Sequence, residues 1–289
     1  MSNELIAAQG MSISDMMGIP TIGGSSSSSN LARISVLNDP IMGVIEVNGK
    51  KVKTEVVPGT AFKVTLGEDN VVYSDTLTVR TFAIRQRWSK WDQNTSTFVK
   101  SVMANELKND LKDSNGGFNC GRPAGYIKDY ASLSEATKTA YNASRRTQVL
   151  MGTLKVNCPV DSNGESVVGH EDAWYPFVYE MKSSESIKSI NEANGKALKR
   201  GNKPLTYTLV LTGVERIGAS GKPYAVLEAS VGPAHDVLDT DMDTLQDFVE
   251  WITNQNDYVL AQWDEKSVDN LSDIDEDLVS GFIDIEVAS

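Results

Sequence analysis

The chain has 289 residues, 40% of them hydrophobic, and a formal net charge of -12. This length is enough for one large domain or two small ones, and without a run of about 18 apolar residues we expect no membrane-spanning helix. Two cysteines are too few for a disulfide framework and no Cys or His spacing fits zinc, so we expect no metal, no cofactor and a reduced, cytoplasmic setting.

The negative charge is concentrated at the C-terminal end. Residues 235–289 contain 16 acidic residues and one lysine, a net charge of -15, whereas residues 1–234 carry 26 basic and 23 acidic residues, or +3. Residues 76–155 alone carry 13 basic and 6 acidic residues, or +7. A basic body joined to an acidic end is typical of nucleic-acid-binding proteins with an acidic tail.

The N-terminal segment, residues 1–30, ends in GGSSSSSN. This composition predicts a flexible arm. It also lacks the basic and apolar regions of a signal peptide. Docking of its Met-rich start on a neighbouring molecule stays open as an alternative.

Short β-type segments follow from residue 31. Alternating or β-branched residues predict strands, and Asn48-Gly49 predicts a hairpin turn. Residues 71–91 predict one long strand or a bent pair. The other expected strands lie within residues 32–37, 42–57, 61–66, 97–102, 147–158, 172–181, 205–217 and 222–231.

Four segments have helical patterns, at residues 101–112, 132–146, 183–200 and 239–252. The third is polar, with Ile187, Ile190 and Leu198 expected on one side, and the fourth is amphipathic.

Together these elements predict a mainly β fold, an OB-like β-barrel with several inserted helices and α+β overall. We expect a body at 31–235, an amphipathic helix at 236–263 and an acidic tail at 264–289.

Catalytic signatures are missing from the sequence. The segment GASGK at 218–222 fails the phosphate-loop pattern at both ends, which leaves a hairpin turn. Cys120 is the one thiol in a glycine-rich loop, and a buried or bystander role fits it better than a Cys-His pair. We therefore expect no catalytic residues and no enzyme activity.

The segment TVRTFAIRQRWSKW combines cationic and aromatic side chains, which is the combination that holds single-stranded nucleic acid. In a strand, alternation places Arg80, Phe82 and Trp88 on one face and Arg85 and Arg87 on the other. Burial of Phe82 and Trp88 in the core is an equally open reading. The expected nucleic-acid-binding residues here are Arg80, Phe82, Arg85, Arg87, Trp88, Lys90 and Trp91.

The loop GGFNCGRPAGY spans residues 116–126 and contains four glycines. Glycines let backbone N–H groups approach a phosphate closely, and Arg122 and Tyr126 offer a planar fork and a stacking face. The alternative is a tight corner with Phe118 and Tyr126 as core plugs. Arg145, Arg146 and Lys155 extend the expected basic surface.

Residues 100–129 resemble a block found in replication-module proteins of tailed phages. The whole arrangement, a mainly β body with a basic, aromatic strand and an acidic C-terminus, resembles phage single-stranded DNA-binding proteins of the OB-fold type. This resemblance implies sequence-tolerant binding of ssDNA in a barrel groove. It also implies a tail that binds replication partners and competes with DNA. The tail departs from the family's usual aromatic end, because Phe282 lies seven positions from the terminus.

We therefore expect a non-enzymatic ssDNA-binding protein of phage DNA replication or recombination, located in the host cytoplasm and without membrane association. A structural phage protein of the virion or tail, with a flexible N-terminal arm, is the alternative. A nuclease is disfavoured because the basic region contains no recognisable carboxylate cluster. The tail residues expected to contact partners are Asp273, Asp275, Glu276, Asp277 and Phe282.

Overall fold

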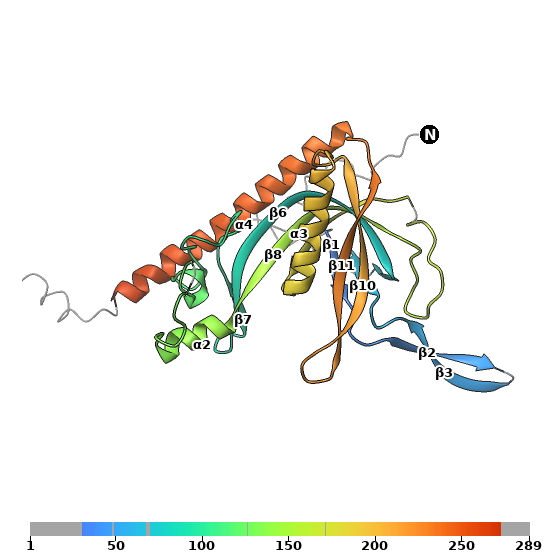
Figure 1. Ribbon diagram of the computed structural model, residues 1–289, viewed down its shortest axis with the longest axis horizontal. Coiled ribbons are helices and arrows are strands. Elements are labelled where there is room, and N and C mark those ends of the chain that lie inside the picture. Colours follow the sequence, from blue (N-terminus) through green and yellow to red (C-terminus); the bar gives the residue numbers. More distant parts are fainter. Residues whose placement is uncertain (1–30, 48, 68–69, 126, 171, 273–289) are drawn as a thin grey trace, which may run out of the picture. The chain divides into compact units, whose positions relative to one another are not determined.

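The computed structural model describes residues 31–272 except 48, 68–69, 126 and 171 (Figure 1). The described chain divides into two compact units, which we treat separately. The first unit contains residues 31–84 and 148–251, and the second contains residues 85–147 and 252–272. The predicted N-terminal arm and residues 273–289 of the predicted tail lie outside the described residues.

The first unit is mainly β, which confirms the coarse fold prediction. Eight strands of one sheet follow the order β11-β10-β6-β8-β9-β1-β4-β5, and β2 and β3 form a separate two-stranded sheet. β1 runs parallel to β9, whereas β1 and β4, β4 and β5, β8 and β9, β6 and β10, and β10 and β11 are antiparallel. The strands are β1 (Ala32–Val36), β2 (Ile41–Val47), β3 (Lys50–Val57), β4 (Phe62–Leu66), β5 (Asn70–Ser74), β6 (Thr76–Asp92), β8 (Ser144–Val156), β9 (Tyr175–Met181), β10 (Tyr207–Ile217) and β11 (Pro223–Ala234). The sheet does not close into a barrel among these described strands.

Helix α3 (Ser184–Lys199) lies along β10 and β11 and completes the main core (Figure 1). Its buried residues Ile187, Ile190, Ala193 and Ala197 pack with apolar side chains from the sheet. Burying each isoleucine contributes about 1.5–3 kcal/mol. Leu198 was expected on this side but is 50% exposed, because the helical turn brings Ala197 inward at that point.

The outer edge of β11 is sealed by side chains rather than by another strand. The backbone N–H groups of Ala225, Leu227 and Ala229 donate to Asn38 Oδ1, Ser186 Oγ and Ser189 Oγ, at 2.9, 3.0 and 2.8 Å. Two of these acceptors belong to α3, so the helix both fills the core and satisfies the edge.

The second unit contains the C-terminal part of β6, β7 (Thr97–Lys100), the short 3-10 helix η1 (Asn119–Gly121), α2 (Glu135–Ala143) and part of α4 (Asp239–Ser272). β7 pairs antiparallel with β6, and Ser134 caps α2 by accepting from the backbone N–H of Thr137. The amphipathic pattern predicted a helix at residues 239–252, but α4 extends from Asp239 to Ser272. It continues past the expected start of the tail at residue 264.

The prediction of a helix at residues 101–112 is wrong, because the structure has no helix there. Its backbone groups bond to other segments instead, since Ala104 exchanges two hydrogen bonds with Gln86 of β6. The side chain of Asn256 on α4 accepts from Met103 N–H at 2.6 Å and donates to Met103 C=O at 3.0 Å. These tertiary bonds replace the local i to i+4 bonds that helix propensity alone favours.

No helix in the described part of the chain is long and apolar enough to span a membrane.

Candidate nucleic-acid interface

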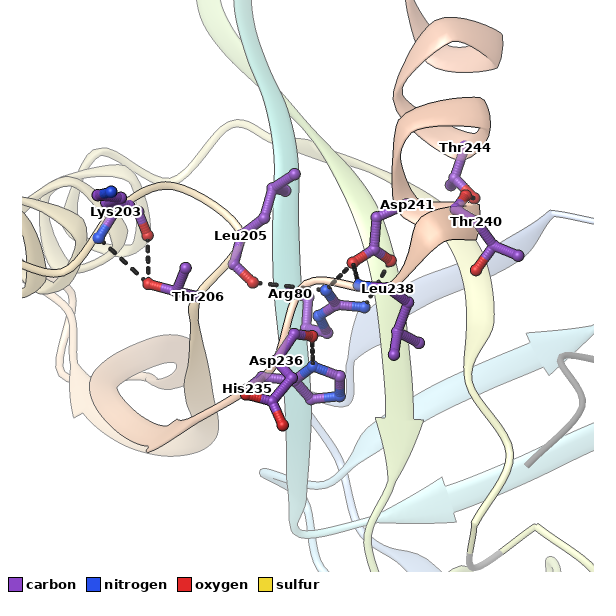
Figure 2. A network of polar contacts seen from close by, with 10 residues as sticks. All are labelled: Arg80, Lys203, Leu205, Thr206, His235, Asp236, Leu238, Thr240, Asp241 and Thr244. Atoms are coloured by element: carbon purple, nitrogen blue, oxygen red, sulfur yellow. Dashed lines mark hydrogen bonds and ion pairs between the residues drawn. The ribbon is translucent and has the colours of Figure 1, made fainter. Parts of the chain in front are cut away.

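Arg80 was expected at the surface but lies inside the first unit, 2% exposed. Its guanidinium forms a two-pronged ion pair with Asp241 at the start of α4, with 2.9 Å from Nη1 to Oδ1 (Figure 2). Asp241 also accepts from Leu238 N–H at 2.8 Å, and Arg80 donates to the Leu205 carbonyl at 3.4 Å. The pair leaves no surface for a phosphate, so Arg80 has a structural role.

Phe82 and Lys155, also in the first unit, are engaged by neighbouring side chains. The ring of Phe82 lies 6.1 Å from that of Phe248 on α4, and the Arg80 guanidinium lies 5.4 Å from its centre. Lys155 pairs with Asp172 at 3.1 Å. Phe82 is thus half-buried, with its ring packed against Phe248 and the Arg80 guanidinium.

The arginines on the other face of β6 are less exposed than the alternation indicated. Arg87 is only 2% exposed and Arg85 is half-buried. Alternation separates the two faces of a strand, but it cannot say which face another element covers. The expectation that Arg87 meets a phosphate at the surface is wrong for this reason.

The loop after residue 112 is organised by the buried carboxylate of Asp113, which is 1% exposed. Its Oδ1 accepts from the N–H groups of Asn115 and Gly117 at 2.9 and 3.3 Å, and its Oδ2 accepts from Cys120 N–H at 2.8 Å. Gly116 adopts a φ of 78°, as expected of a corner. Of the glycine N–H groups proposed for a phosphate, that of Gly117 binds this carboxylate, and those of Gly116 and Gly121 donate to the carbonyls of Asp113 and Phe118. These three donors are therefore already used within the chain.

Cys120 is 4% exposed, which confirms a buried thiol. Its Sγ lies 3.6 Å from the carbonyl of Val99. Burial, followed by the nearby charge of Asp113, raises the pKa of the Cys120 thiol to about 12. Because the thiolate is the nucleophile, this thiol is inert at neutral pH.

Thiol labelling checks this placement. At about pH 8 the native protein should react at the exposed Cys158 and not at Cys120, because only the first is accessible. Denaturation should expose the second thiol. Peptide mass spectrometry after iodoacetamide treatment identifies each site, and rapid native labelling of Cys120 would contradict the buried placement.

Helix α4 holds the loop of the second unit in place. Trp263 Nε1 donates to the Gly117 carbonyl at 3.0 Å, and its ring lies edge-on to Phe118 with 5.8 Å between centres. The Lys112 ammonium lies 3.7 Å from the centre of the Trp263 ring, and Lys266 donates to another loop carbonyl. Phe118 is therefore a contact of α4, 45% exposed, rather than a core plug.

Arg122 is the predicted residue with the most distinctive surroundings. Its guanidinium carbon lies 4.4 Å from the ring centre of Trp88 on β6 and 3.6 Å from that of Tyr141 on α2. Tyr130 packs edge-on against Tyr141, with 5.4 Å between ring centres. The Arg122 backbone N–H donates to the Asn119 carbonyl, but its guanidinium forms no hydrogen bond or ion pair with another described residue. Two rings therefore hold a cation whose side-chain N–H donors have no acceptor there.

Arg145 extends this group, which we call the Arg122 cluster (Trp88, Arg122, Tyr130, Tyr141, Asn142 and Arg145). Asn142 links its members, because its side chain donates to Tyr130 Oη at 3.0 Å and its carbonyl accepts from Arg145. Arg145 and Tyr130 are exposed, and Arg122, Trp88 and Tyr141 are half-buried. Tyr130 and Tyr141 could not be predicted as site residues from the sequence, because only the folded loop and α2 bring them beside Arg122.

A second aromatic pair lies on the opposite face of β6. Trp91 and its cross-strand partner Phe98 on β7 are 48% and 44% exposed, with 4.9 Å between ring centres. Trp88 and Trp91 are three residues apart, so alternation turns them to different faces. The two tryptophans, both expected to stack on bases, therefore lie on opposite faces of β6 and do not form one stacking surface.

Lys90 is half-buried and Arg146 is exposed at the start of β8. Tyr126 lies outside the described residues. So do all five tail residues expected to contact partners, Asp273, Asp275, Glu276, Asp277 and Phe282.

Within the described residues, no three His, Cys, Asp or Glu side chains are grouped to hold a metal ion. No protein-family model matches the chain, and neither a curated protein nor a solved structure matches it.

Proposed function

We propose that this protein is a non-enzymatic ssDNA-binding protein that acts in phage DNA replication or recombination. The observation that carries the proposal is Arg122, whose cation is fixed between two rings and has no acceptor among the described residues. A guanidinium stacked on rings keeps its planar fork of donors available, and a DNA phosphate is a two-oxygen acceptor that matches it.

The surroundings of Arg122 support single-stranded rather than double-stranded DNA as the ligand. Exposed or half-exposed rings of Tyr130, Tyr141 and Trp88 offer faces to unpaired bases, and Arg145 adds a second cation. Residues 85–147 carry 11 basic and 6 acidic residues, a net charge of +5. Cations along the backbone and rings under the bases are the general means of holding ssDNA without sequence preference.

We also propose that the sheet of the first unit is an open relative of the OB-like barrel. Asn38, just after β1, bonds to Ala225 of β11. Gly213 of β10 approaches Thr60 so closely that a Cβ there would lie 1.7 Å from the Thr60 carbonyl oxygen. Distant strands of the sheet order therefore approach each other. A structure in which the edge strands β5 and β11 are joined by a hydrogen-bonded ladder would support the barrel, and well-separated edge strands would contradict it.

Titration with oligo-dT tests the function directly. Binding should be tighter for the oligonucleotide than for a duplex of equal length, because duplex bases cannot stack on the rings. Raising salt from about 50 to 200 mM should weaken it steeply through counterion release.

No binding at low salt would overturn the function, and large ordered assemblies without ssDNA preference, seen by mass photometry, would favour a virion component instead.

The acidic C-terminus gives a second arm of this test. Residues 273–289 contain 6 acidic and no basic residues. If they compete with DNA, a chain ending at residue 272 should bind oligo-dT several-fold more tightly at low salt, and the difference should shrink as salt screens it. Truncation at residue 263 would remove Lys266, which bonds to the loop, so the cut belongs after α4.

A further inference from the structure

The β2–β3 hairpin of the first unit forms a sheet of its own (Figure 1). Its turn is closed by Val47 pairing with Lys50, with Gly49 at a φ of 74°. An isolated two-stranded ribbon is at best marginally stable in water. The ribbon therefore has unused pairing capacity on its outer edges.

Hairpin geometry decides which backbone groups of the ribbon face outward. In a hairpin with a two-residue turn, the residues that flank the turn exchange both hydrogen bonds, and every second pair after them does the same. The pairs Met42 with Glu55, Val44 with Lys53 and Glu46 with Lys51 are then the ones whose N–H and C=O groups point away from the partner strand. On β2 none of these groups bonds to another described residue.

The other strand edges of the first unit, at β11 and β5, are covered by hydrogen-bonding partners. Three N–H groups along the outer edge of β11 donate to side chains of Asn38 and α3. At β5, Tyr73 exchanges two backbone hydrogen bonds with Val160, which covers that edge. Natural proteins cover or charge the edges that must not pair with another chain.

The two edges of the ribbon also differ in charge. The outward positions of β3 include Lys51 and Lys53, and lysine is a common guard of strand edges. On β2 the same positions are Met42, Val44 and Glu46. Val44 is 66% exposed and Met42 is 43% exposed on one face of the strand. An apolar edge with open backbone groups is a template for a further strand.

We propose that β2 pairs antiparallel with β2 of a second copy of this chain, with Val44 beside Val44 across a two-fold axis. This register uses the outward groups of all three β2 positions on each copy. It sets Met42 opposite Glu46, so no like charges face each other, and it buries the two Val44 side chains against each other. Self-pairing of β3 about Lys53 would place lysine against lysine.

The result is a four-stranded sheet across an isologous dimer. The inference stands on backbone geometry and charge and does not depend on DNA binding. Such an edge contact buries little area, so we expect a weak dimer that dissociates at about 10 µM.

A matched pair of proline variants tests the edge. Val44→Pro and Lys53→Pro each remove one outward N–H without removing a bond of the hairpin, and proline is tolerated at such edge positions. Sedimentation velocity from about 1 to 100 µM should show a concentration-dependent dimer for the wild type and for Lys53→Pro. Val44→Pro should remain monomeric, with an unchanged circular dichroism spectrum.

Three results would overturn the proposal. One is a wild-type chain that stays monomeric throughout this range, and another is a dimer that survives Val44→Pro. The third is loss of the dimer in Lys53→Pro with a native spectrum, which would assign the contact to β3. If Val44→Pro alters the spectrum, Val44→Lys replaces it and should give the monomer, because it sets two lysines opposite each other.

Discussion

Arg80→Ala is expected to lower the free energy of unfolding by about 3–5 kcal/mol, the usual cost of removing one partner of a buried ion pair. The substitution leaves the Asp241 carboxylate buried without its cation, and Asp241 also holds the Leu238 N–H at the start of α4. Urea unfolding followed by circular dichroism measures the change.

Arg216→Ala is the matched control for this prediction. Arg216 pairs with Glu185 and Glu228, but its side chain is 38% exposed, so its loss should cost less than about 1 kcal/mol. The double variant Arg80→Met with Asp241→Leu should recover much of the stability, because it removes both charges. Equal effects of Arg80→Ala and Arg216→Ala would contradict the importance of the buried pair.

Arg122→Ala is expected to weaken oligo-dT binding by about 10- to 100-fold, which corresponds to one hydrogen-bonded charge contact. The side chain is half-buried between two rings and bonds to no other described residue, so the far-ultraviolet spectrum should stay native. Fluorescence anisotropy at fixed low salt measures the affinity.

Two control variants test whether binding depends on the Arg122 cluster itself. One tests the effect of charge alone, and the other tests the opposite face of β6. Arg122→Lys keeps the charge but loses the planar fork, so its affinity should fall between those of the wild type and Arg122→Ala. Trp91→Ala removes an exposed ring on the opposite face and should have the smaller effect. If Trp91→Ala weakens binding more than Arg122→Ala does, the DNA lies on the Trp91–Phe98 face and the assignment to the cluster is wrong.

Residues 71–91 were predicted as one long strand or a bent pair, and the structure has two successive strands there, β5 and β6. Their β-branched and aromatic residues made the strand structure predictable. The burial of the β6 arginines was not predictable. Arg80 is buried because a carboxylate 161 residues later in the chain reaches it, and no local pattern carries that information. The sequence therefore identified a basic, aromatic strand correctly but could not separate structural cations from exposed ones.

In the Arg122 loop, too, the backbone conformation was predictable but the hydrogen-bond partners were not. Its glycines predicted a corner, and Gly116 and Gly121 have the positive φ that the prediction requires. Its use of N–H groups was misjudged because Asp113 lies just outside the conspicuous GGFNCGRPAGY segment and fills the site meant for a phosphate. Arg122 and Trp88 were both candidates, but their stacking required Tyr141 from α2, which no spacing rule connects to them.

The side-chain hydrogen bonds that cover the edge of β11 depend largely on one helix. Ser186 and Ser189 protect the sheet edge only while α3 stays packed, because they reach it from the same face that buries Ile187 and Ile190. Detachment of α3 would expose apolar surface and free strand N–H groups in a single event. Packing of α3 therefore covers a strand edge that could otherwise pair with another chain, in addition to filling the core.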